Sequence, residues 1–176
     1  MKINTSISVV IRIFLWLLML LGGAALAIAI DKGTLLFESL SFHLVSALFG
    51  IVIISLAFRA AANGGRELTK GREGNIPRLE TNKLVTSGIY SCMRHPMLFG
   101  LTLLPFGWAL LIGSPTFITI IAPIEMIFII IMVTIFEEME VKRKFSQEYK
   151  AYKKEVPMVS FKPSCLKELF TKQTHD

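Results

Sequence analysis

Long apolar runs most constrain what this chain can fold into. Three of them, at 7–30, 40–62 and 116–136, are long enough for a membrane-spanning helix, which needs roughly 20 apolar residues. A fourth run, at 97–112, is shorter and contains Pro105, which can kink or tilt a helix. Gly113-Ser114-Pro115 then predicts a tight turn into the run at 116–136. Among 176 residues, 53% are hydrophobic and only 18% are charged, which excludes an ordinary soluble domain. The sequence predicts an all-α integral membrane protein with about four transmembrane helices.

The first run has two interpretations. Lys2, the apolar stretch and the small residues at 25–29 are typical of a secretory signal peptide. The run is long for the apolar region of such a signal, however, and the glycines and alanines at 22–25 form a small-residue surface. Such a surface lets a second helix approach closely. We therefore predict a membrane helix in which residues 22–25 contact another helix.

Basic residues are concentrated in two parts of the chain. Seven lie within 59–94 and nine follow residue 136, whereas the connection at 31–39 has one and that at 113–115 has none. Because cytoplasmic loops are enriched in Lys and Arg, the sequence predicts a multi-pass protein with both termini in the cytoplasm. The net charge of +6 then reflects topology and attraction to anionic membrane lipids. No basic face is free of the membrane, so we expect no nucleic-acid partner.

The order of polar and apolar segments divides the chain into two parts. Residues 1–62 form an N-terminal transmembrane hairpin. Residues 63–176 form one structural unit with a cytosolic loop, a transmembrane hairpin and a C-terminal tail. In the loop, the glycines and the proline of 63–77 predict irregular backbone, without the spacing of a phosphate-binding or dinucleotide-binding motif. Pro96 suits the first turn of the helix that follows.

Two cysteines, Cys92 and Cys165, fall in segments predicted to be cytoplasmic. They are too few and too far apart in the sequence for a metal site or a disulfide framework. We therefore expect no metal. For Cys165 we expect either an inert thiol or a lipidated one.

The C-terminal tail starts with acidic residues and continues with an amphipathic pattern. Glu137 and Glu138 stand where the fourth apolar run ends. Apolar and aromatic residues then recur every three or four positions from 145 to 156, which predicts an amphipathic helix lying on the inner leaflet. Carboxylates near an anionic leaflet are unfavourable without a cationic partner, so the acidic pair needs one.

Arg94 and His95 can supply that partner. They precede the third apolar run, whereas Glu137 and Glu138 follow the fourth, so an antiparallel hairpin of the two runs makes the pairs neighbours. With Tyr90 they would form a polar pocket where lipid chains meet water. Such a pocket suits a zwitterionic cofactor with a nucleoside and a lipophilic substrate. The competing interpretation is an ion pair that only ties the ends of the hairpin together.

A series of separated motifs resembles a known group of enzymes. The motifs are Gly88-x-Tyr90-x-x-x-Arg94-His95-Pro96-x-x-x-Gly100, then Glu137-Glu138, then Phe145-Ser-Gln-Glu148-Tyr149-x-x-Tyr152-x-x-x-Val156-Pro157. Over about residues 83 to 163, this order resembles the C-terminal half of the isoprenylcysteine carboxyl methyltransferases. The wider group includes the phospholipid methyltransferases. The resemblance implies that S-adenosylmethionine binds from the cytosol and that a lipophilic acceptor comes from the bilayer.

The resemblance also implies roles for particular residues. One group would wrap the adenosine and methionine parts of the cofactor: Leu84, Val85, Gly88, Tyr90, Arg94, His95 and Pro96. Glu137 and Glu138 would hold its amino group. Methyl transfer is an in-line displacement that needs alignment and exclusion of water, and it requires no metal.

The chain departs from the pattern near the acceptor site. Family members that methylate a carboxylate resemble one another in having an arginine about one helical turn before the paired glutamates, where this chain has Val133. The acceptor therefore stays open between a prenylcysteine-like carboxylate, a lipid headgroup and a thiol. Besides Glu138, the catalytic candidates are Arg59, which could contact the acceptor, and Glu125. Glu125 lies within the fourth run and could be a base, bind an acceptor amine, or be a protonated carboxyl hydrogen-bonded inside the bundle.

The sequence thus predicts methyl transfer from S-adenosylmethionine to a lipophilic acceptor at the cytosolic membrane face, and it leaves the oligomeric state open. One alternative is an NADPH-dependent reductase of the sterol-reductase type, whose members have a similar Arg-His-Pro region. Another is a membrane scaffold without enzymatic activity. The phosphates of NADPH need several basic residues in the pocket, whereas a sulfonium tolerates Glu137 and Glu138, which favours methyl transfer.

Overall fold

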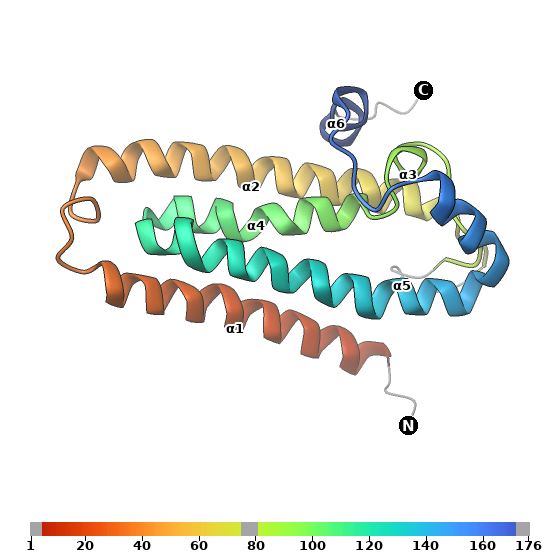
Figure 1. The fold of residues 1–176 in the computed structure, drawn as a ribbon, viewed down its shortest axis with the longest axis horizontal. Coiled ribbons are helices and arrows are strands. Elements are labelled where there is room, and N and C mark those ends of the chain that lie inside the picture. The colour runs from red at the N-terminus through yellow and green to blue at the C-terminus, as the bar shows by residue number, and fades with distance from the viewer. Residues whose placement is uncertain (1–4, 75–80, 172–176) are drawn as a thin grey trace. The chain divides into compact units, whose positions relative to one another are not determined.

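The structure, a computed structural model, describes residues 5–74 and 81–171, without the side chains of 5–13, 136 and 137. Within these residues the chain forms helices and no strand (Figure 1), which confirms the all-α prediction. In chain order the elements are α1 (Thr5–Asp31), α2 (Leu40–Thr69), α3 (Ile89–Cys92), α4 (Pro96–Ile112), the π-helical turn η1 (Phe117–Ile121), α5 (Ala122–Glu155) and α6 (Pro163–Phe170).

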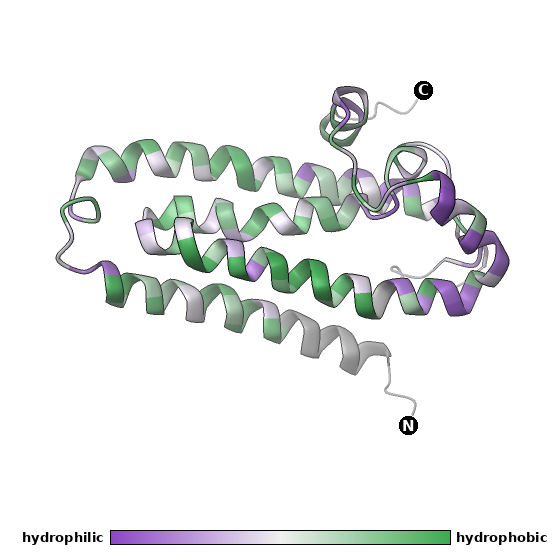
Figure 2. Cartoon of the chain, in the orientation of Figure 1, coloured by the Kyte–Doolittle hydropathy of each residue, from purple (hydrophilic) through white to green (hydrophobic). Residues whose placement is uncertain are grey.

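Three helical segments are long and apolar enough to cross a membrane: Phe14–Asp31, Leu40–Thr69 and Phe117–Glu155. Pro96–Ile112 is apolar but shorter. Hydrophobic residues predominate along these helices, whereas hydrophilic residues dominate the last part of α5 (Figure 2). Twenty residues of helix cover about 30 Å, so 117–136 is long enough to cross a hydrocarbon core. A membrane protein is therefore confirmed, and the number of four crossings stays a prediction.

The chain divides into two compact units, each assembled from two separate segments. The first unit comprises Met1–Ile53 and Pro105–Ile127, and the second comprises Ile54–Leu104 and Phe128–Asp176. The boundaries fall inside α2, α4 and α5, so that each of these helices contributes to both units. The grouping into 1–62 and 63–176 stays a prediction about the chain's organisation.

Small residues allow the helices of the first unit to pack closely. Ala24 and Ala27 of α1 are buried in a cluster with Phe117. A side chain at Gly23 would collide with Glu125 and Ile121, and one at Gly50 would come within 2.6 Å of the Leu111 backbone nitrogen. Close approach is therefore confirmed for the small-residue surface at Gly23 and Ala24.

Asp31, the last residue of α1, holds the turn between α4 and η1 in the first unit. Its buried carboxylate accepts hydrogen bonds from the hydroxyls of Ser114 and Thr116 and from the Thr116 backbone N–H, the last at 3.1 Å from Oδ2. Gly113 takes a positive φ of 71°, and the ring of His43 lies against it. This confirms the predicted tight turn, against which His43 packs.

In the second unit, α2 continues to Thr69, so irregular backbone was the wrong prediction for residues 63–69. Gly64 in this segment allows close packing of α2 against its neighbour and does not mark irregular backbone. A methyl group at Gly64 would lie 2.7 Å from the Met97 side chain. Asn63 uses its side-chain amide to donate to the carbonyl oxygens of Leu169 and Thr171, at 2.6 and 2.9 Å. These bonds satisfy carbonyl groups that the end of α6 leaves without helical partners.

Cys92 and Cys165 form a disulfide, which makes the prediction of two separate thiols wrong. Their Cα atoms are 5.7 Å apart although 73 positions separate them in the sequence. Cys165 and Leu169 of α6 are buried against Ile89 and Met93, at α3. Packing of α6 on α3 brings the sulfurs together, and sequence spacing carries no information about that packing.

The amphipathic tail is the second part of α5, and it does not continue as one straight helix. Ser146 has non-helical dihedral angles, with φ 36°, and marks a kink. Tyr149 and Tyr152, beyond the kink, are buried within the second unit, and the Tyr152 hydroxyl donates to the Tyr90 carbonyl. The predicted apolar stripe is present, but for these two tyrosines it faces protein rather than the inner leaflet.

Candidate functional site

Glu138 is the centre of a buried charge cluster in the second unit. The residue is 8% exposed, and its carboxylate accepts hydrogen bonds from Arg94 through one oxygen and from Lys153 through the other. The Nε2 atom of His95 is 3.6 Å from Oε1 of Glu138. Lys153 stands 15 positions after Glu138, which in a straight helix would separate them by about 22 Å. The kink at Ser146 therefore allows this contact.

Arg94 and His95 are held in place by the segment that connects α5 with α6. The Arg94 backbone N–H donates to the Pro157 carbonyl at 3.0 Å, and the His95 N–H donates to the Met158 carbonyl at 3.1 Å. The Arg94 guanidinium also donates to the Tyr149 hydroxyl at 2.9 Å and lies 5.9 Å from the centre of the Tyr149 ring. A cation this close to an aromatic ring is attracted to its face. The motif that contains Arg94 is therefore fixed from both its backbone and its side chain.

Burial and neighbouring charges set the protonation states. Burial lowers the pKa of His95 below its usual value of 6.5, and this effect outweighs the opposite influence of Glu138. Burial would raise the pKa of Glu138, but its hydrogen bond with Lys153 and the charge of Arg94 bring it below its usual value. At neutral pH the cluster thus contains an anionic Glu138, two cations and an uncharged imidazole.

Gly88 lies at the start of α3 directly against Glu67, the last carboxylate of α2. Glu67 is 1% exposed; it accepts from the Ser87 hydroxyl at 3.0 Å and has Lys70 Nζ at 2.7 and 2.8 Å from its two oxygens. A Cβ on Gly88 would be 2.6 Å from the Glu67 carboxyl carbon, and φ at Gly88 is +54°. Only glycine fits here without displacement. Sequence reasoning missed Glu67, since no motif includes it.

The loop before α3 borders an open hollow of about 600 Å³. Its lining residues come from this loop, from α3 and from the end of α5, and they are Leu84, Thr86, Ser91, Glu148, Tyr152, Glu155 and Val156. This volume is in the range of sites that bind small molecules. Val85, next to Leu84, packs instead against the buried cluster that contains Ile89 and Tyr90.

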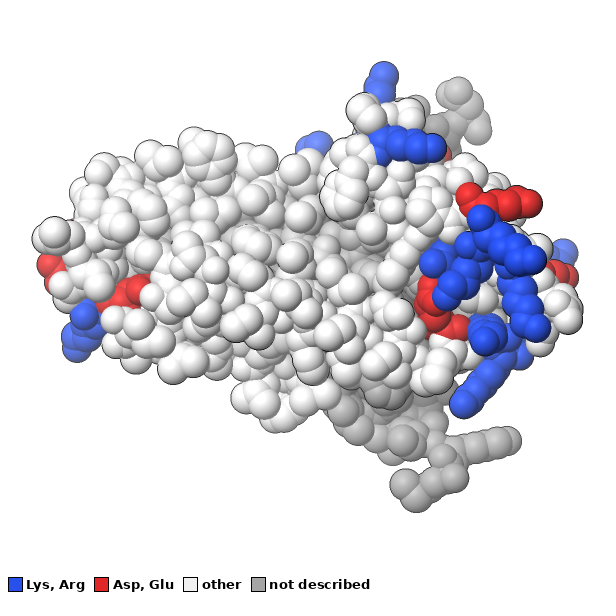
Figure 3. Space-filling view, in the orientation of Figure 1, with Lys and Arg blue, Asp and Glu red and all other residues white. Residues whose placement is uncertain are grey.

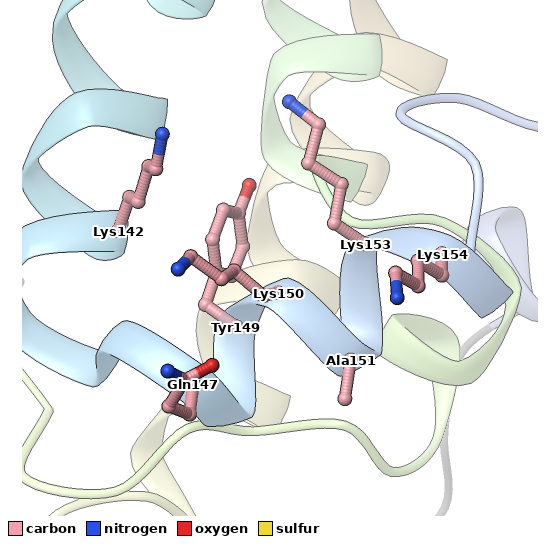
Figure 4. Close-up of a pocket in the computed structure, with 7 residues that line it drawn as sticks. All are labelled: Lys142, Gln147, Tyr149, Lys150, Ala151, Lys153 and Lys154. Atoms are coloured by element: carbon pink, nitrogen blue, oxygen red, sulfur yellow. The ribbon is translucent and has the colours of Figure 1, made fainter.

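A second hollow, of about 540 Å³, lies beside the charge cluster (Figure 4). All of its lining residues belong to α5: Lys142, Gln147, Tyr149, Lys150, Ala151, Lys153 and Lys154. Tyr149 and Lys153 are thus shared by this hollow and by the cluster around Glu138. Sequence reasoning placed Tyr149 in the apolar stripe and gave Lys153 no part in the site, so it missed both.

The structure brings three of the predicted site residues together, namely Arg94, His95 and Glu138. Tyr90 is buried in α3 with its hydroxyl donating to the Gly64 carbonyl at 3.5 Å. Pro96 is buried at the first position of α4, as expected. The predicted meeting of the Arg-His pair with the acidic end of the fourth apolar run is therefore confirmed for Glu138.

Three other predicted residues have no described contact with the cluster. The side chain of Glu137 lies outside the described residues. Arg59 is exposed on α2, and among the described residues no hydrogen bond or ion pair joins it to the cluster. Glu125 belongs to the first unit, where it is buried and its Oε2 atom has no hydrogen-bond partner among the described residues. Catalytic roles for Arg59 and Glu125 stay predictions.

The side chains around Glu138 define what the charge cluster can bind. In the described part of the chain no three His, Cys, Asp or Glu side chains are grouped as a metal site would need. Glu138 instead offers a carboxylate that one partly exposed cation covers, since the Lys153 side chain is 52% exposed. Such a cation can be solvated when it leaves, but the buried Glu138 carboxylate then needs another cation in its place. Arg94 offers a guanidinium beside that carboxylate.

Comparison with known proteins identifies one family. The family model described as phospholipid methyltransferase matches residues 44–148, more than half of the chain. The matched region includes Arg94, His95 and Glu138 and ends before Lys153. No curated protein and no solved structure matches the chain.

Proposed function

Because this chain belongs to the phospholipid methyltransferase family, we propose that it transfers a methyl group from S-adenosylmethionine to a lipophilic acceptor at the cytosolic membrane surface. Membership implies a methyltransferase that acts on lipid substrates. The cofactor and the kind of acceptor are what the proposal adds. The observation that carries it is the buried Glu138 carboxylate, held by cations next to the membrane-crossing part of α5.

The charges of the cluster match the amino-acid end of the cofactor. That end has an ammonium group next to a carboxylate, and the site has the Glu138 carboxylate next to the Arg94 guanidinium. Charge-assisted hydrogen bonds of this kind are stronger than those between neutral groups. Lys153 is the partner that the ammonium group would replace, because it is half exposed and bonded to Glu138 alone among the described carboxylates. When bound, S-adenosylmethionine supplies an electrophilic methyl group.

The loop before α3 supports binding of the nucleoside part. Leu84 and Tyr152 border the 600 Å³ hollow, and the Thr86 and Ser91 hydroxyls on its wall can bond to polar groups. Glu67 and Gly88 hold this loop against the end of α2 through their close contact. A nucleoside in this hollow and an amino acid at Glu138 would engage residues of all three motifs on which the family resemblance rests.

The acceptor we propose is a lipid headgroup amine, which reacts through the lone pair of its unprotonated form, or a thiol. Val133 stands where carboxylate-methylating relatives have an arginine, so the chain lacks that partner for a negatively charged acceptor. The family description, phospholipid methyltransferase, agrees with a headgroup amine as the methyl acceptor. The residues would act by orienting the groups and by excluding water.

Calorimetric titration of the detergent-purified protein with S-adenosylhomocysteine and with NADPH tests the proposal. Glu138→Gln is the informative variant, and Glu140→Gln, an exposed position on the same helix, is the matched control. We expect S-adenosylhomocysteine to bind the protein and the control equally and the Glu138 variant at least about 30-fold more weakly, as for a lost buried charge pair.

Other outcomes of this titration would contradict the proposal. Binding of NADPH alone would indicate the reductase. Binding of neither ligand would indicate the scaffold. Undiminished binding of S-adenosylhomocysteine to Glu138→Gln would remove Glu138 from the cofactor site.

A further inference from the structure

We propose that the lysine hollow, the 540 Å³ hollow lined by Lys142, Lys150, Lys153 and Lys154, binds the phosphate of an anionic phospholipid headgroup. The family match assigns no function to it and ends at residue 148, before three of the four lysines. This anionic phospholipid stays bound while the methyl acceptor reacts. It is therefore a separate ligand from the methyl acceptor.

The kink at Ser146 builds the lysine hollow. Lys142 comes from the part of α5 before the kink, and the other lining residues come from the part after it (Figure 4). A straight helix would place Lys142 and Lys153 about 16 Å apart along its axis. In Figure 4 their side chains stand on either side of the Tyr149 ring. Serine seldom adopts a positive φ, and such strained residues cluster at ligand sites.

The charges in the lysine hollow are largely uncompensated. Lys153 pairs with Glu138, whereas among the described side chains Lys142, Lys150 and Lys154 have no ion-pair partner. All four lysines are exposed, and basic side chains gather at this end of α5 (Figure 3). Ammonium groups that line one hollow repel one another, and a bound anion relieves that repulsion. The Gln147 amide adds a hydrogen-bond donor to the wall.

The depth of the lysine hollow indicates a lipid rather than a free anion. The apolar part of α5 ends at residue 136, and Lys142 follows six residues later, a rise of about 9 Å. Headgroups occupy roughly 5–8 Å on each side of the hydrocarbon. The chain beyond the kink returns far enough for Lys153 to reach Glu138, about 3 Å beyond the apolar part. The hollow therefore spans the layer in which lipid phosphates lie.

Lys153 links this site to Glu138. A phosphate in the lysine hollow would compete with Glu138 for the Lys153 ammonium group and free one carboxylate oxygen. This second step rests on the proposed function, in which Glu138 receives the cofactor's ammonium group. Anionic lipid would then raise the affinity for S-adenosylhomocysteine.

Native mass spectrometry of the purified protein with added dioleoylphosphatidylglycerol or dioleoylphosphatidylcholine tests the lipid site. The variant Lys150→Gln/Lys154→Gln removes two lysines of the hollow. The control Lys144→Gln/Lys162→Gln removes two exposed lysines that do not line it. Each lysine near an anionic lipid is worth about fivefold in affinity. We therefore expect phosphatidylglycerol binding to fall about 25-fold in the hollow variant and less than about threefold in the control.

Three outcomes would overturn the lipid site. Equal losses in the two variants would mean that the lysines act only through diffuse surface charge. Equal binding of the two lipids would remove the need for an anion. Displacement of the lipid by inorganic phosphate at matching concentrations would show that the hollow binds the phosphate group from any source rather than a lipid.

Calorimetry with S-adenosylhomocysteine in nanodiscs of either lipid tests the link. Tighter binding in phosphatidylglycerol, absent in the hollow variant, would support competition for Lys153. An affinity that does not depend on the lipid would overturn that competition and leave the lipid site standing. If phosphatidylglycerol binds but S-adenosylhomocysteine binds in neither lipid, the proposed function fails and the lipid site does not.

Discussion

Asp31 in the first unit and Glu138 in the second are both buried carboxylates, but their donors differ in kind. Asp31, 3% exposed, accepts from two hydroxyls and one backbone N–H. Glu138, 8% exposed, accepts from the side chains of Arg94 and Lys153. Neutral donors on short side chains and on the backbone hold a carboxylate permanently in the fold. Cations on long side chains can be exchanged for a cation of a ligand.

The difference in donors gives the two carboxylates different roles: Asp31 stabilises the fold, whereas Glu138 can bind a ligand. The Asp31 contacts join the end of α1 to the turn before η1, so that breaking them costs folding free energy. Lys153 is half exposed and can be solvated when it leaves, so a cation of a ligand can take its place without leaving the buried Glu138 carboxylate unpaired. Burial alone therefore does not identify a functional carboxylate, and the chemistry of its donors does.

Reduction of the disulfide between Cys92 and Cys165 should have the largest effect on stability and should distinguish the two units. A cross-link over 73 positions stabilises a protein by about 2–4 kcal/mol. Both tryptophans, Trp16 and Trp108, lie in the first unit. In thermal unfolding in detergent, reductant should lower the midpoint seen by circular dichroism more than that seen by tryptophan fluorescence. Cys92→Ser/Cys165→Ser is the control that should not respond to reductant, and two titratable thiols in the unreduced protein would contradict the expectation.

Asp31→Asn should destabilise the first unit and leave the charge cluster intact. The hydroxyl and amide donors lose a charged acceptor, which costs about 2–3 kcal/mol. Tryptophan fluorescence during thermal unfolding measures the loss, with the exposed Glu38→Gln as the matched control. Affinity for S-adenosylhomocysteine should stay within about twofold. A large loss of affinity without a loss of stability would mean that the two carboxylates do not differ as described.

Gly88→Ala should weaken the second unit by about 1–3 kcal/mol and reduce cofactor affinity, because the position has φ +54° and adjoins Glu67. Gly65→Ala is a control with the opposite expected sign. It lies within α2 with nothing near its added methyl group, so stability should rise by about 0.5–1 kcal/mol. Thermal unfolding and titration with S-adenosylhomocysteine measure both effects. Equal behaviour of the two variants would show that the contact with Glu67 does not position the loop.

The smallest effect should be a pH dependence that comes from His95. Burial lowers its pKa in the folded protein below 6.5, so the unfolded chain binds the extra proton first. The folding free energy that comes from keeping His95 uncharged is fully present above pH 6.5. It is lost as the pH falls from 6.5 toward the pKa of His95 in the folded protein. Glu138, whose pKa is lowered from 4.5, adds a loss only at more acidic pH. His95→Gln should therefore flatten the fall in melting temperature between pH 7.5 and 5.5, and an unchanged slope would assign it to other groups.

Much of the charge cluster could be predicted because its motifs lie at the ends of recognisable apolar runs. Arg94 and His95 stand at one end of an apolar hairpin and Glu138 at the other, so that helix length alone brings them to the same membrane face. The positions of Lys153 and Tyr149 in the cluster could not be predicted. They depend on the backbone kink at Ser146, and a serine in the sequence does not predict a positive φ.

By itself, the sequence determined the all-α membrane architecture, the tight turn at Gly113 and the pairing of the Arg-His motif with Glu138. These features follow from apolar length, turn chemistry and motif order, which are properties of short segments. Only the tertiary structure decided that Cys92 meets Cys165, that Glu67 supports Gly88 and that lysines on both sides of a kink line one hollow. Such contacts depend on how one segment packs on another, and a close approach across many residues leaves no periodic trace in the chain.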